Sequence, residues 1–316
     1  MTAYTPFSDD SHLLLFTLVV TVAYQLAFFS VAFTFKFDKV TDFAGGSNFV
    51  VLAFLTLISG GYYHARQIVA TLAVMFWGLR LSAFLLYRVI KMGKDDRFDG
   101  IRDNFFRFLT FWIGQMIWVW TVSLPVTFLN TTETNPSLSA ADIAGLTMFV
   151  VGFLFETVGD IQKDIFKSKG RRGVCTTGLW YYTRHPNYFG ELLLWWGIFT
   201  GCSTVFNAAE DADEGTWGYS TIAGPIFTTA IILFVSGIPT VELSWDKKYG
   251  NSEAYWDYKE STSLLIPLPP ALFKPLPNVM KTWLLFEWPI YQGSNREASI
   301  ADDYMEAPGS ESEAKR

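Results

Sequence analysis

The chain has 316 residues, of which 50% are hydrophobic, 17% aromatic and only 17% charged. This composition is too apolar for an ordinary soluble domain and is typical of a protein that crosses a membrane several times. A net charge of -6 gives no basic surface for nucleic acid, and two cysteines are too few for a disulfide framework or a thiolate metal site. We therefore expect neither a nucleic-acid partner nor a bound metal.

Apolar stretches of the length that a membrane span requires, about 20 residues, recur along the chain. In chain order they are residues 13–35, 49–63, 68–90, 108–129, 143–158, 188–206 and 222–241. The pattern predicts an all-α polytopic membrane protein with seven transmembrane helices over residues 1–291. Residues 292–316 are acidic and rich in small residues, and we expect them to form a disordered tail.

The basic residues predict the orientation of this protein in the membrane. Nearly all Lys and Arg occur in residues 36–48, 91–107 and 161–187 and after residue 242, whereas the N-terminus and residues 130–141 and 207–220 have none and the turn after the second span has only Arg66. With seven spans these two kinds of segment alternate, so the positive-inside rule predicts an outside or lumenal N-terminus and a cytosolic C-terminus. A glycosylation sequon, Asn130-Thr131-Thr132, falls in a predicted outward loop.

The densest group of polar residues precedes and opens the sixth span, between Gly178 and Glu191. It includes Arg184, His185 and Asn187, and polar groups at the mouth of a membrane helix are costly unless they bind something. Pro186 disfavours helical geometry at the preceding residue, so we expect a helix to begin directly behind His185, with unsatisfied amides and its positive dipole end exposed. This pattern predicts an anion-binding position and a functional role for His185.

A second polar cluster lies at the end of the fifth span, where Glu156, Asp160 and Lys163 are followed by a basic loop that reaches Arg172. Glu156 and Asp160 are like charges at i and i+4, which is unfavourable on an isolated helix. Two interpretations stay open. The cluster binds a ligand that carries phosphates and hydroxyls, or it forms a structural salt-bridge set with Lys163 and Arg184.

The third span carries basic residues within or close to its apolar stretch. Arg80, Tyr87 and Arg88 are spaced by seven or eight residues and share one helical face. Lys91 and Lys94 are interpreted as interfacial anchors. Arg80 lies about two turns deeper than Arg88, so we expect it to have an internal partner or a ligand.

The last span leads into a polar and aromatic segment that includes Glu242, Tyr258 and Lys259. It is interpreted either as part of a site or as an amphipathic lid in the lipid headgroups. Residues 283–291 are aromatic enough to lie along the membrane surface.

Motifs along most of the chain carry a resemblance to a known superfamily. They are Asp42-Phe43, Trp77-Gly-Leu-Arg80, Lys94-Asp95-Asp96-Arg97-Phe98, Glu156, Gly159-Asp160, Gln162-Lys163, Gly178-Leu-Trp180, Arg184-His-Pro-Asn-Tyr-Phe-Gly-Glu191, Glu242, Tyr249-Gly250, Tyr255, Tyr258-Lys259, Thr262-Ser263 and Ile266-Pro267. In these motifs the chain resembles the steroid 5-alpha-reductase-like membrane proteins, and most closely the uncharacterised branch with the Arg-His-Pro-Asn-Tyr-Phe-Gly-Glu motif.

The resemblance implies a seven-helix oxidoreductase of an internal membrane such as the endoplasmic reticulum. Such an enzyme takes NADPH from the cytosolic side and reduces a carbon–carbon double bond of a sterol or enone lipid that enters from the bilayer. Its catalytic half would cover about residues 142–270. The resemblance and the polar clusters together predict a cofactor-binding set formed by Arg80, Glu156, Asp160, Lys163, Arg171, Arg172, Arg184, Asn187, Glu191 and Tyr258.

The proton donor departs from the superfamily pattern. Steroid 5-alpha-reductases hold the substrate ketone with a Glu and a Tyr from early spans, whereas this chain has no Glu before Glu133 and has Trp77 in the place of the Tyr. The catalytic candidates are therefore Tyr87, Tyr188 and His185.

Two other functions fit part of the same pattern. Isoprenylcysteine and phospholipid methyltransferases, which bind S-adenosylmethionine, also carry an Arg-His-Pro-x-Tyr-x-Gly segment. Their tail contains an Arg followed by paired Glu, whereas Glu242 here stands alone and has no Arg beside it. The other alternative is a non-catalytic lipid-binding membrane protein.

Overall fold

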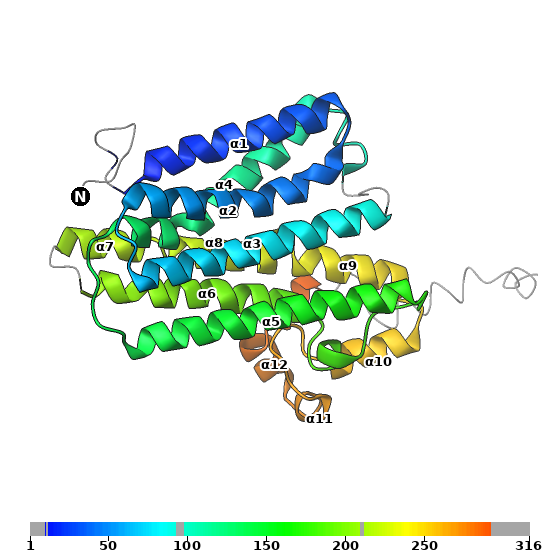
Figure 1. The fold of residues 1–316 in the computed structure, drawn as a ribbon. Helices are drawn as coiled ribbons and strands as arrows, with labels where there is room; N and C mark the ends of the chain where they lie inside the picture. The colour runs from blue at the N-terminus through cyan, green and yellow to red at the C-terminus, as the bar shows by residue number, and fades with distance from the viewer. Residues whose placement is uncertain (1–9, 11, 93–97, 209–211, 292–316) are drawn as a thin grey trace, which may run out of the picture. The chain divides into compact units, whose positions relative to one another are not determined.

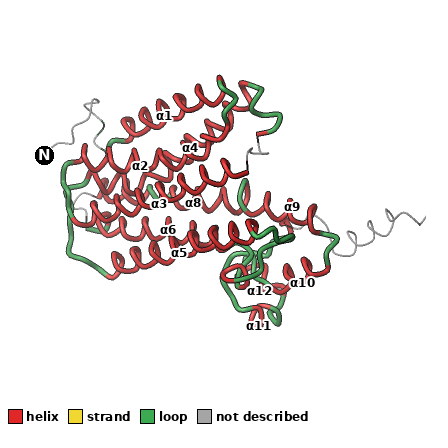
Figure 2. The backbone as a smooth tube through the Cα atoms, turned by 45° about the vertical axis from the view of Figure 1, so that its right-hand side comes forward, coloured by secondary structure: helices red, strands yellow, loops and turns green. Residues whose placement is uncertain are grey.

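The computed structural model describes residue 10 and residues 12–92, 98–208 and 212–291. These residues form helices and loops, and no strand occurs among them (Figure 2). The helices are α1 Leu14–Thr34, η1 Asp38–Val40, α2 Thr41–Gly60, α3 Ala65–Met92, α4 Phe105–Thr131, α5 Ala140–Ser168, η3 Gly178–Tyr181, α6 Pro186–Phe206, α7 Ala212–Ser220, α8 Ala223–Ala230, the π-helix η4 Ile231–Val235, α9 Ile238–Tyr249, α10 Glu253–Ser261, α11 Pro270–Phe273, α12 Asn278–Leu284 and η5 Pro289–Tyr291.

Within the described residues, seven helical stretches are long and apolar enough to cross a membrane, which confirms the predicted number of spans. Two predicted boundaries are wrong. The second span begins near residue 38 rather than 49, because polar and small residues such as Asn48 and Gly46 are helical and buried. The fifth span continues to Ser168 rather than ending at residue 158, so its charged residues lie on the same helix as its apolar ones.

The seventh span is also longer than the predicted residues 222–241, and it is interrupted. The stretch from Gly215 to Tyr249 contains the end of α7 and all of α8, η4 and α9, with a break at Ser236 and Gly237. A Cβ added at Gly237 would lie 2.5 Å from the carbonyl oxygen of Ile232, so only glycine fits there. Pro239 opens α9 at a position where its missing amide hydrogen costs no helical bond.

The chain divides into two compact units, and the first comprises the residues up to Phe149 together with Trp195–Thr228. Its helices α1 to α4 lie side by side (Figure 1). Aromatic side chains fill its core, where Phe29, Phe108 and Trp112 are almost completely buried. Burial of this apolar surface is the main force that holds the unit together.

Polar side chains buried in the first unit satisfy one another. Gln25 Nε2 donates to Asn48 Oδ1 over 3.0 Å, and Gln115 Nε2 donates to Gln25 Oε1 over 2.8 Å, so three helices are linked. Asn130 lies in the last turn of α4, is 1% exposed and donates to the hydroxyls of Thr56 and Thr71. The interpretation of Asn130 as a sequon in a loop is therefore wrong, because its amide is used inside the helix bundle.

The second unit comprises Val150–Leu194 and the residues from Thr229 onward. It contains the end of α5, the start of α6, and α9 with the short helices that follow it. α10, α11 and α12 gather below α9 in both views (Figures 1 and 2). The predicted catalytic half covers residues 142–270. Of these, residues 142–149 and 195–228 belong to the first unit and the others to the second. A catalytic role for this half stays a prediction.

Helices α5 and α6 approach each other backbone to backbone through glycines spaced by seven residues. In the first unit, a Cβ on Gly145 would lie 2.6 Å from the carbonyl oxygen of Gly197. In the second unit, a Cβ on Gly152 would lie 2.5 Å from the carbonyl oxygen of Gly190. Neither contact has room for a side chain. The glycines therefore allow the backbones of the two helices to approach closely.

The contact between Gly152 and Gly190 predicts that Gly152→Ala destabilises the protein by roughly 1–3 kcal/mol, because the added methyl group must push the backbones of α5 and α6 apart. Gly114→Ala in α4 is the matched control, because nothing lies within 4 Å of the Cβ that it adds. The thermal midpoint of the purified protein in detergent checks both variants. Equal midpoints for Gly152→Ala and Gly114→Ala would contradict the close approach.

Candidate functional site

A short backbone pairing fixes the segment that leads into α6. Thr183 and Ser263 form a parallel bridge, and the amide of Arg184 donates to the carbonyl oxygen of Ser263 over 2.8 Å. The hydroxyl of Thr183 donates to the carbonyls of Leu264 and Leu265. These bonds occupy backbone groups that a loop would otherwise leave unpaired, so Arg184 and His185 have fixed positions before α6 begins. The predicted start of this helix directly after His185 is confirmed.

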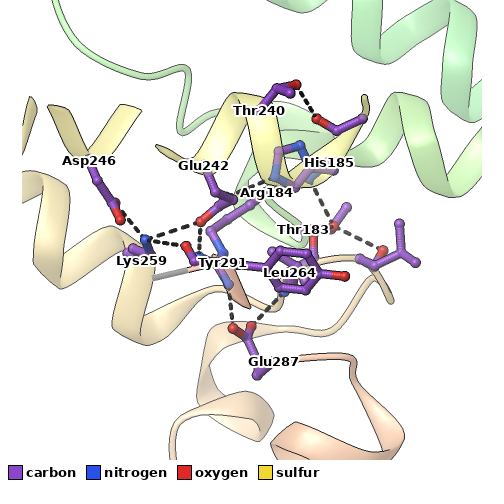
Figure 3. A network of polar contacts seen from close by, with 12 residues as sticks. Thr183, Arg184, His185, Thr240, Glu242, Asp246, Lys259, Leu264, Glu287 and Tyr291 are labelled. Carbon is purple, nitrogen blue, oxygen red and sulfur yellow. Dashed lines mark hydrogen bonds and ion pairs between the residues drawn. The ribbon is translucent and has the colours of Figure 1, made fainter. Parts of the chain in front are cut away.

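Glu242 is the centre of a buried charge network (Figure 3). Its Oε2 accepts from Arg184 Nη1 over 2.7 Å, and its Oε1 lies 2.8 Å from His185 Nε2. Arg184 Nη2 donates to Glu287 Oε2 over 2.5 Å. Glu242 is 0% exposed, and Arg184 and His185 are each 1% exposed. A carboxylate buried this deeply requires such partners.

Lys259 extends this network toward α10. Its ammonium lies 3.3 Å from Glu242 Oε2 and 2.5 Å from Asp246 Oδ1, and Asp246 also accepts from the hydroxyl of Tyr255. Tyr258, one residue before Lys259, donates to the carbonyl oxygen of Trp180 over 2.6 Å. The network therefore joins α9 and α10 to the loop before α6.

Burial and the charges of this network shift the pKa values of three groups outside the helical spans. Burial alone would lower the pKa of Arg184, but the carboxylates of Glu242 and Glu287 outweigh it and raise that pKa. Burial lowers the pKa of His185, although the hydrogen bond to Glu242 opposes the shift. Burial raises the pKa of Tyr258. The lowered pKa favours a neutral imidazole at pH 7, and in that form an Nε2–H group donates a hydrogen bond to the carboxylate of Glu242.

His185 lies in a column of aromatic rings. Its imidazole stacks on Trp245 at a centroid distance of 5.4 Å and an interplanar angle of 13°. Tyr188 stacks on the imidazole at 5.4 Å and 21°. The ammonium of Lys163 lies 4.8 Å from the centroid of Trp180 and 5.3 Å from that of Trp245. The column therefore places stacked aromatic rings and a lysine cation next to one another at the start of α6.

The close packing of α5 on α6 brings the second predicted cluster to this mouth. A Cβ on Gly159 would lie 3.3 Å from Pro186, and a Cβ on Gly190 would lie 2.5 Å from the amide nitrogen of Glu156. Glu156 is 3% exposed, and Asp160 and Lys163 follow it at successive turns of α5. These contacts bring the start of α6, with His185, Asn187 and Tyr188, against the turns of α5 that carry Glu156, Asp160 and Lys163, and Glu191 follows one turn later on α6. Arg184 does not belong to the salt-bridge set that the alternative interpretation expected here, because its guanidinium binds Glu242 and Glu287. The pairing of Lys163 with this cluster stays a prediction.

Asn187 has a buried acceptor that the protein leaves unsatisfied. Its Oδ1 is shielded from solvent and has no hydrogen-bond partner. Buried amide oxygens are nearly always paired, because desolvation without a partner costs about 1–3 kcal/mol. An unpaired acceptor in the first turn of α6, next to Tyr188 in the sequence, is a position where a donor from a ligand can bind.

The remaining predicted residues lie elsewhere. Arg171 and Arg172 are exposed in the loop after α5, where Arg171 lies 5.8 Å from the ring centroid of Phe166. Arg80 and Tyr87 belong to α3 in the first unit, where Arg80 lies 5.4 Å from the ring of Phe84 and Tyr87 accepts a hydrogen bond from Lys91. Residues 94–97, which include the predicted anchor Lys94, and the predicted tail, residues 292–316, lie outside the described residues.

Sequence reasoning missed two acidic members of the network, Glu287 and Asp246. Glu287 lies 103 residues after its partner Arg184, inside a segment that was interpreted only as aromatic membrane surface. Asp246 follows Glu242 by four residues on α9, and that spacing was the available signal.

A cavity of about 630 Å³ adjoins the network on the side of Glu287. Arg184, Lys259 and Glu287 line it, together with residues of α10, α11 and α12. His185 and Glu287 lie at opposite ends of the charge network (Figure 3). The network therefore separates this cavity from the aromatic column.

Comparison with known proteins gives one match. Residues 28–262 match a family described as a protein of unknown function (DUF1295). The chain belongs to this family. No curated protein and no solved structure matches it. The DUF1295 match includes the aromatic column, the α5 and α6 cluster and Glu242, but it ends before Glu287 and before the α11 and α12 walls of the cavity.

The lowered pKa of His185 predicts how stability depends on pH. Below its ordinary pKa of about 6.5, an unfolded chain protonates this imidazole while the folded chain does not, so folding loses stability as the pH falls. We expect the thermal midpoint to fall between pH 7.5 and pH 5.5, with a contribution from His185 of up to about 1.4 kcal/mol per pH unit. His185→Gln should show a shallower dependence over the same range. Parallel curves for the two proteins would mean that His185 titrates alike in both states.

Proposed function

We propose that this protein is a membrane-embedded, NADPH-dependent oxidoreductase that reduces a carbon–carbon double bond of a sterol or enone lipid. The unpaired Oδ1 of Asn187 is the observation that carries the proposal. It is an acceptor, so it calls for a ligand donor such as the carboxamide of a nicotinamide or a ribose hydroxyl. The resemblance of the surrounding motif to steroid 5-alpha-reductase-like proteins supports the same reading.

The residues around Asn187 have the chemistry that a dinucleotide requires. Lys163 supplies a cation on an aromatic surface, and the exposed Arg171 and Arg172 supply further positive charge for phosphates. Glu156, Asp160 and Glu191 are acceptors for ribose hydroxyls. NADPH, when bound, would supply the hydride for the reduction.

Arg184 has a different part in this proposal from the one that the sequence suggested. Two of its nitrogens bind Glu242 and Glu287, and the side chain is 1% exposed. It would support the cofactor site by holding the start of α6 in place rather than by binding phosphate directly. Tyr258 would act likewise, because its hydroxyl is bonded to the carbonyl of Trp180.

Among the three candidate proton donors, the geometry favours Tyr188. His185 is neutral and its Nε2 proton is committed to Glu242, which suits a residue that positions others. Tyr87 is 50% exposed on α3. Tyr188 is half-buried, stacks on His185 and follows Asn187 directly, so its phenol has the best position from which to polarise a carbonyl next to a bound cofactor.

The proposed orientation follows from the charges. The loop between α5 and α6 and the segment after α9 carry many of the basic residues, so we place them in the cytosol, with the N-terminus lumenal. An internal membrane such as the endoplasmic reticulum would give this face access to cytosolic NADPH.

Cofactor binding is the first test. We expect NADPH to raise the thermal midpoint of the detergent-purified protein saturably, and Asn187→Ala to weaken binding by about tenfold or more, since it removes the acceptor. Asn251→Ala, an exposed asparagine in the same unit, is the matched control. Stabilisation by S-adenosylmethionine instead would favour methyl transfer, and a response to neither would favour a non-catalytic lipid-binding protein.

The proton donor is tested by turnover. We expect Tyr188→Phe to lower NADPH oxidation with a responsive sterol or enone lipid by roughly 10²- to 10⁴-fold, because the general acid is lost. NADPH affinity should stay unchanged in this variant, and Tyr87→Phe should keep its activity. A Tyr188→Phe protein that turns over normally, or that no longer binds NADPH, would refute this role.

A further inference from the structure

Helix α12 presents its apolar side outward. Val279, Trp283 and Leu284 are 69%, 75% and 60% exposed. The opposite side of the helix carries Lys281 and Thr282, and these residues line the 630 Å³ cavity. A short helix that faces water would have the reverse arrangement, so this one is suited to an apolar surface.

The cavity behind α12 has basic side chains that the charge network does not neutralise. Arg184 and Lys259 line it but bind carboxylates of the network. Lys274 and Lys281 have no carboxylate partner among the described residues. Lys281 instead donates to the carbonyl oxygen of Lys274 over 3.3 Å and lies 4.5 Å from the ring of Phe273. Neither ammonium group forms an ion pair within the described residues, although the carboxylate of Glu260 also lines the cavity.

The segment that follows α12 holds these lysines in place. Glu287 accepts from Arg184 and from the amide of Leu264. Trp288 stacks on Phe234 at 5.2 Å and 9°, and the hydroxyl of Tyr291 donates to the carbonyl of Leu233 over 2.9 Å. The wall of the cavity is thus fixed to the seventh span rather than attached loosely.

We propose that α11 and α12 lie on the membrane surface and that the cavity binds the phosphate headgroup of an anionic phospholipid. The exposed apolar side chains would contact acyl chains, while Lys274 and Lys281 would bind the phosphate. Both groups belong to one amphipathic segment, and its apolar side faces away from the cavity that the lysines line. This inference does not depend on the proposed reductase activity, because it uses a different cavity and different residues.

Binding of short-chain lipids to the full-length protein in detergent tests the headgroup site. We expect dioctanoyl phosphatidic acid to bind, as measured by native mass spectrometry and calorimetry, while dioctanoylglycerol and glycerol phosphate do not. The double variant Lys274→Gln, Lys281→Gln should bind the phosphatidic acid about 25-fold more weakly, or about fivefold for each lysine. Lys247→Gln, Lys248→Gln is the matched control, because these lysines are exposed on α9 and lie outside the cavity.

Several outcomes would overturn this proposal. Glycerol phosphate that binds as tightly as the lipid would mean a site for soluble phosphates. Absence of lipid binding, or wild-type affinity in the Lys274→Gln, Lys281→Gln protein, would exclude the lysines as a headgroup site.

A second measurement tests the outward face of α12. The protein is reconstituted in vesicles whose acyl chains carry bromine, and the fluorescence of the wild type is compared with that of Trp283→Phe. We expect the emission contributed by Trp283 to be quenched by the brominated chains. Unquenched Trp283 emission would place this face against water or protein and refute the membrane contact.

Discussion

The buried carboxylate of Glu242 is the constraint on which the second unit depends. An ionised carboxylate that is 0% exposed is stable only when charges and hydrogen-bond donors surround it, and Arg184, His185 and Lys259 provide them. These partners come from the loop before α6 and from α10. Removal of any one leaves a buried charge or hydrogen-bonding group without a partner, so the network adds to the apolar cluster around Ile238, Leu264 and Tyr291 in fixing the relative positions of these segments.

The same constraint divides the polar residues into two groups with different roles. Side chains that bind Glu242 are committed to structure, and they hold the aromatic column and the first turn of α6 in place. Asn187 and Lys163 lie next to this rigid framework, where the Oδ1 of Asn187 has no hydrogen-bond partner and the ammonium of Lys163 lies over the ring of Trp245. A ligand site benefits from such an arrangement, because side chains held by a second layer of contacts lose little entropy when the ligand binds.

Much of the fold follows from the sequence, since hydropathy and the basic loops define the seven spans. The start of α6 also follows, because Pro186 limits the residue before it. The charge network cannot be predicted from the sequence, because Arg184 is separated from Glu242 by 58 residues and from Glu287 by 103. Local pattern assigns a residue to a helix or a loop, but it does not pair charges across such distances. Asn130 illustrates the same limit. A sequon is recognised from three neighbouring residues, whereas the burial of Asn130 depends on residues far away in the sequence.

The interruption of the seventh span connects these features. A π-helix adds residues to a turn, so η4 and the break at Gly237 change the face on which the residues of α9 lie, Glu242 among them. Broken helices inside a membrane are tolerated when their free carbonyl groups find donors. Here the hydroxyl of Thr240 donates to the carbonyls of Ser236 and Gly237, and that of Tyr291 donates to Leu233. The C-terminal segment therefore does more than close the cavity, because Tyr291 satisfies the irregular backbone that sets the direction of Glu242.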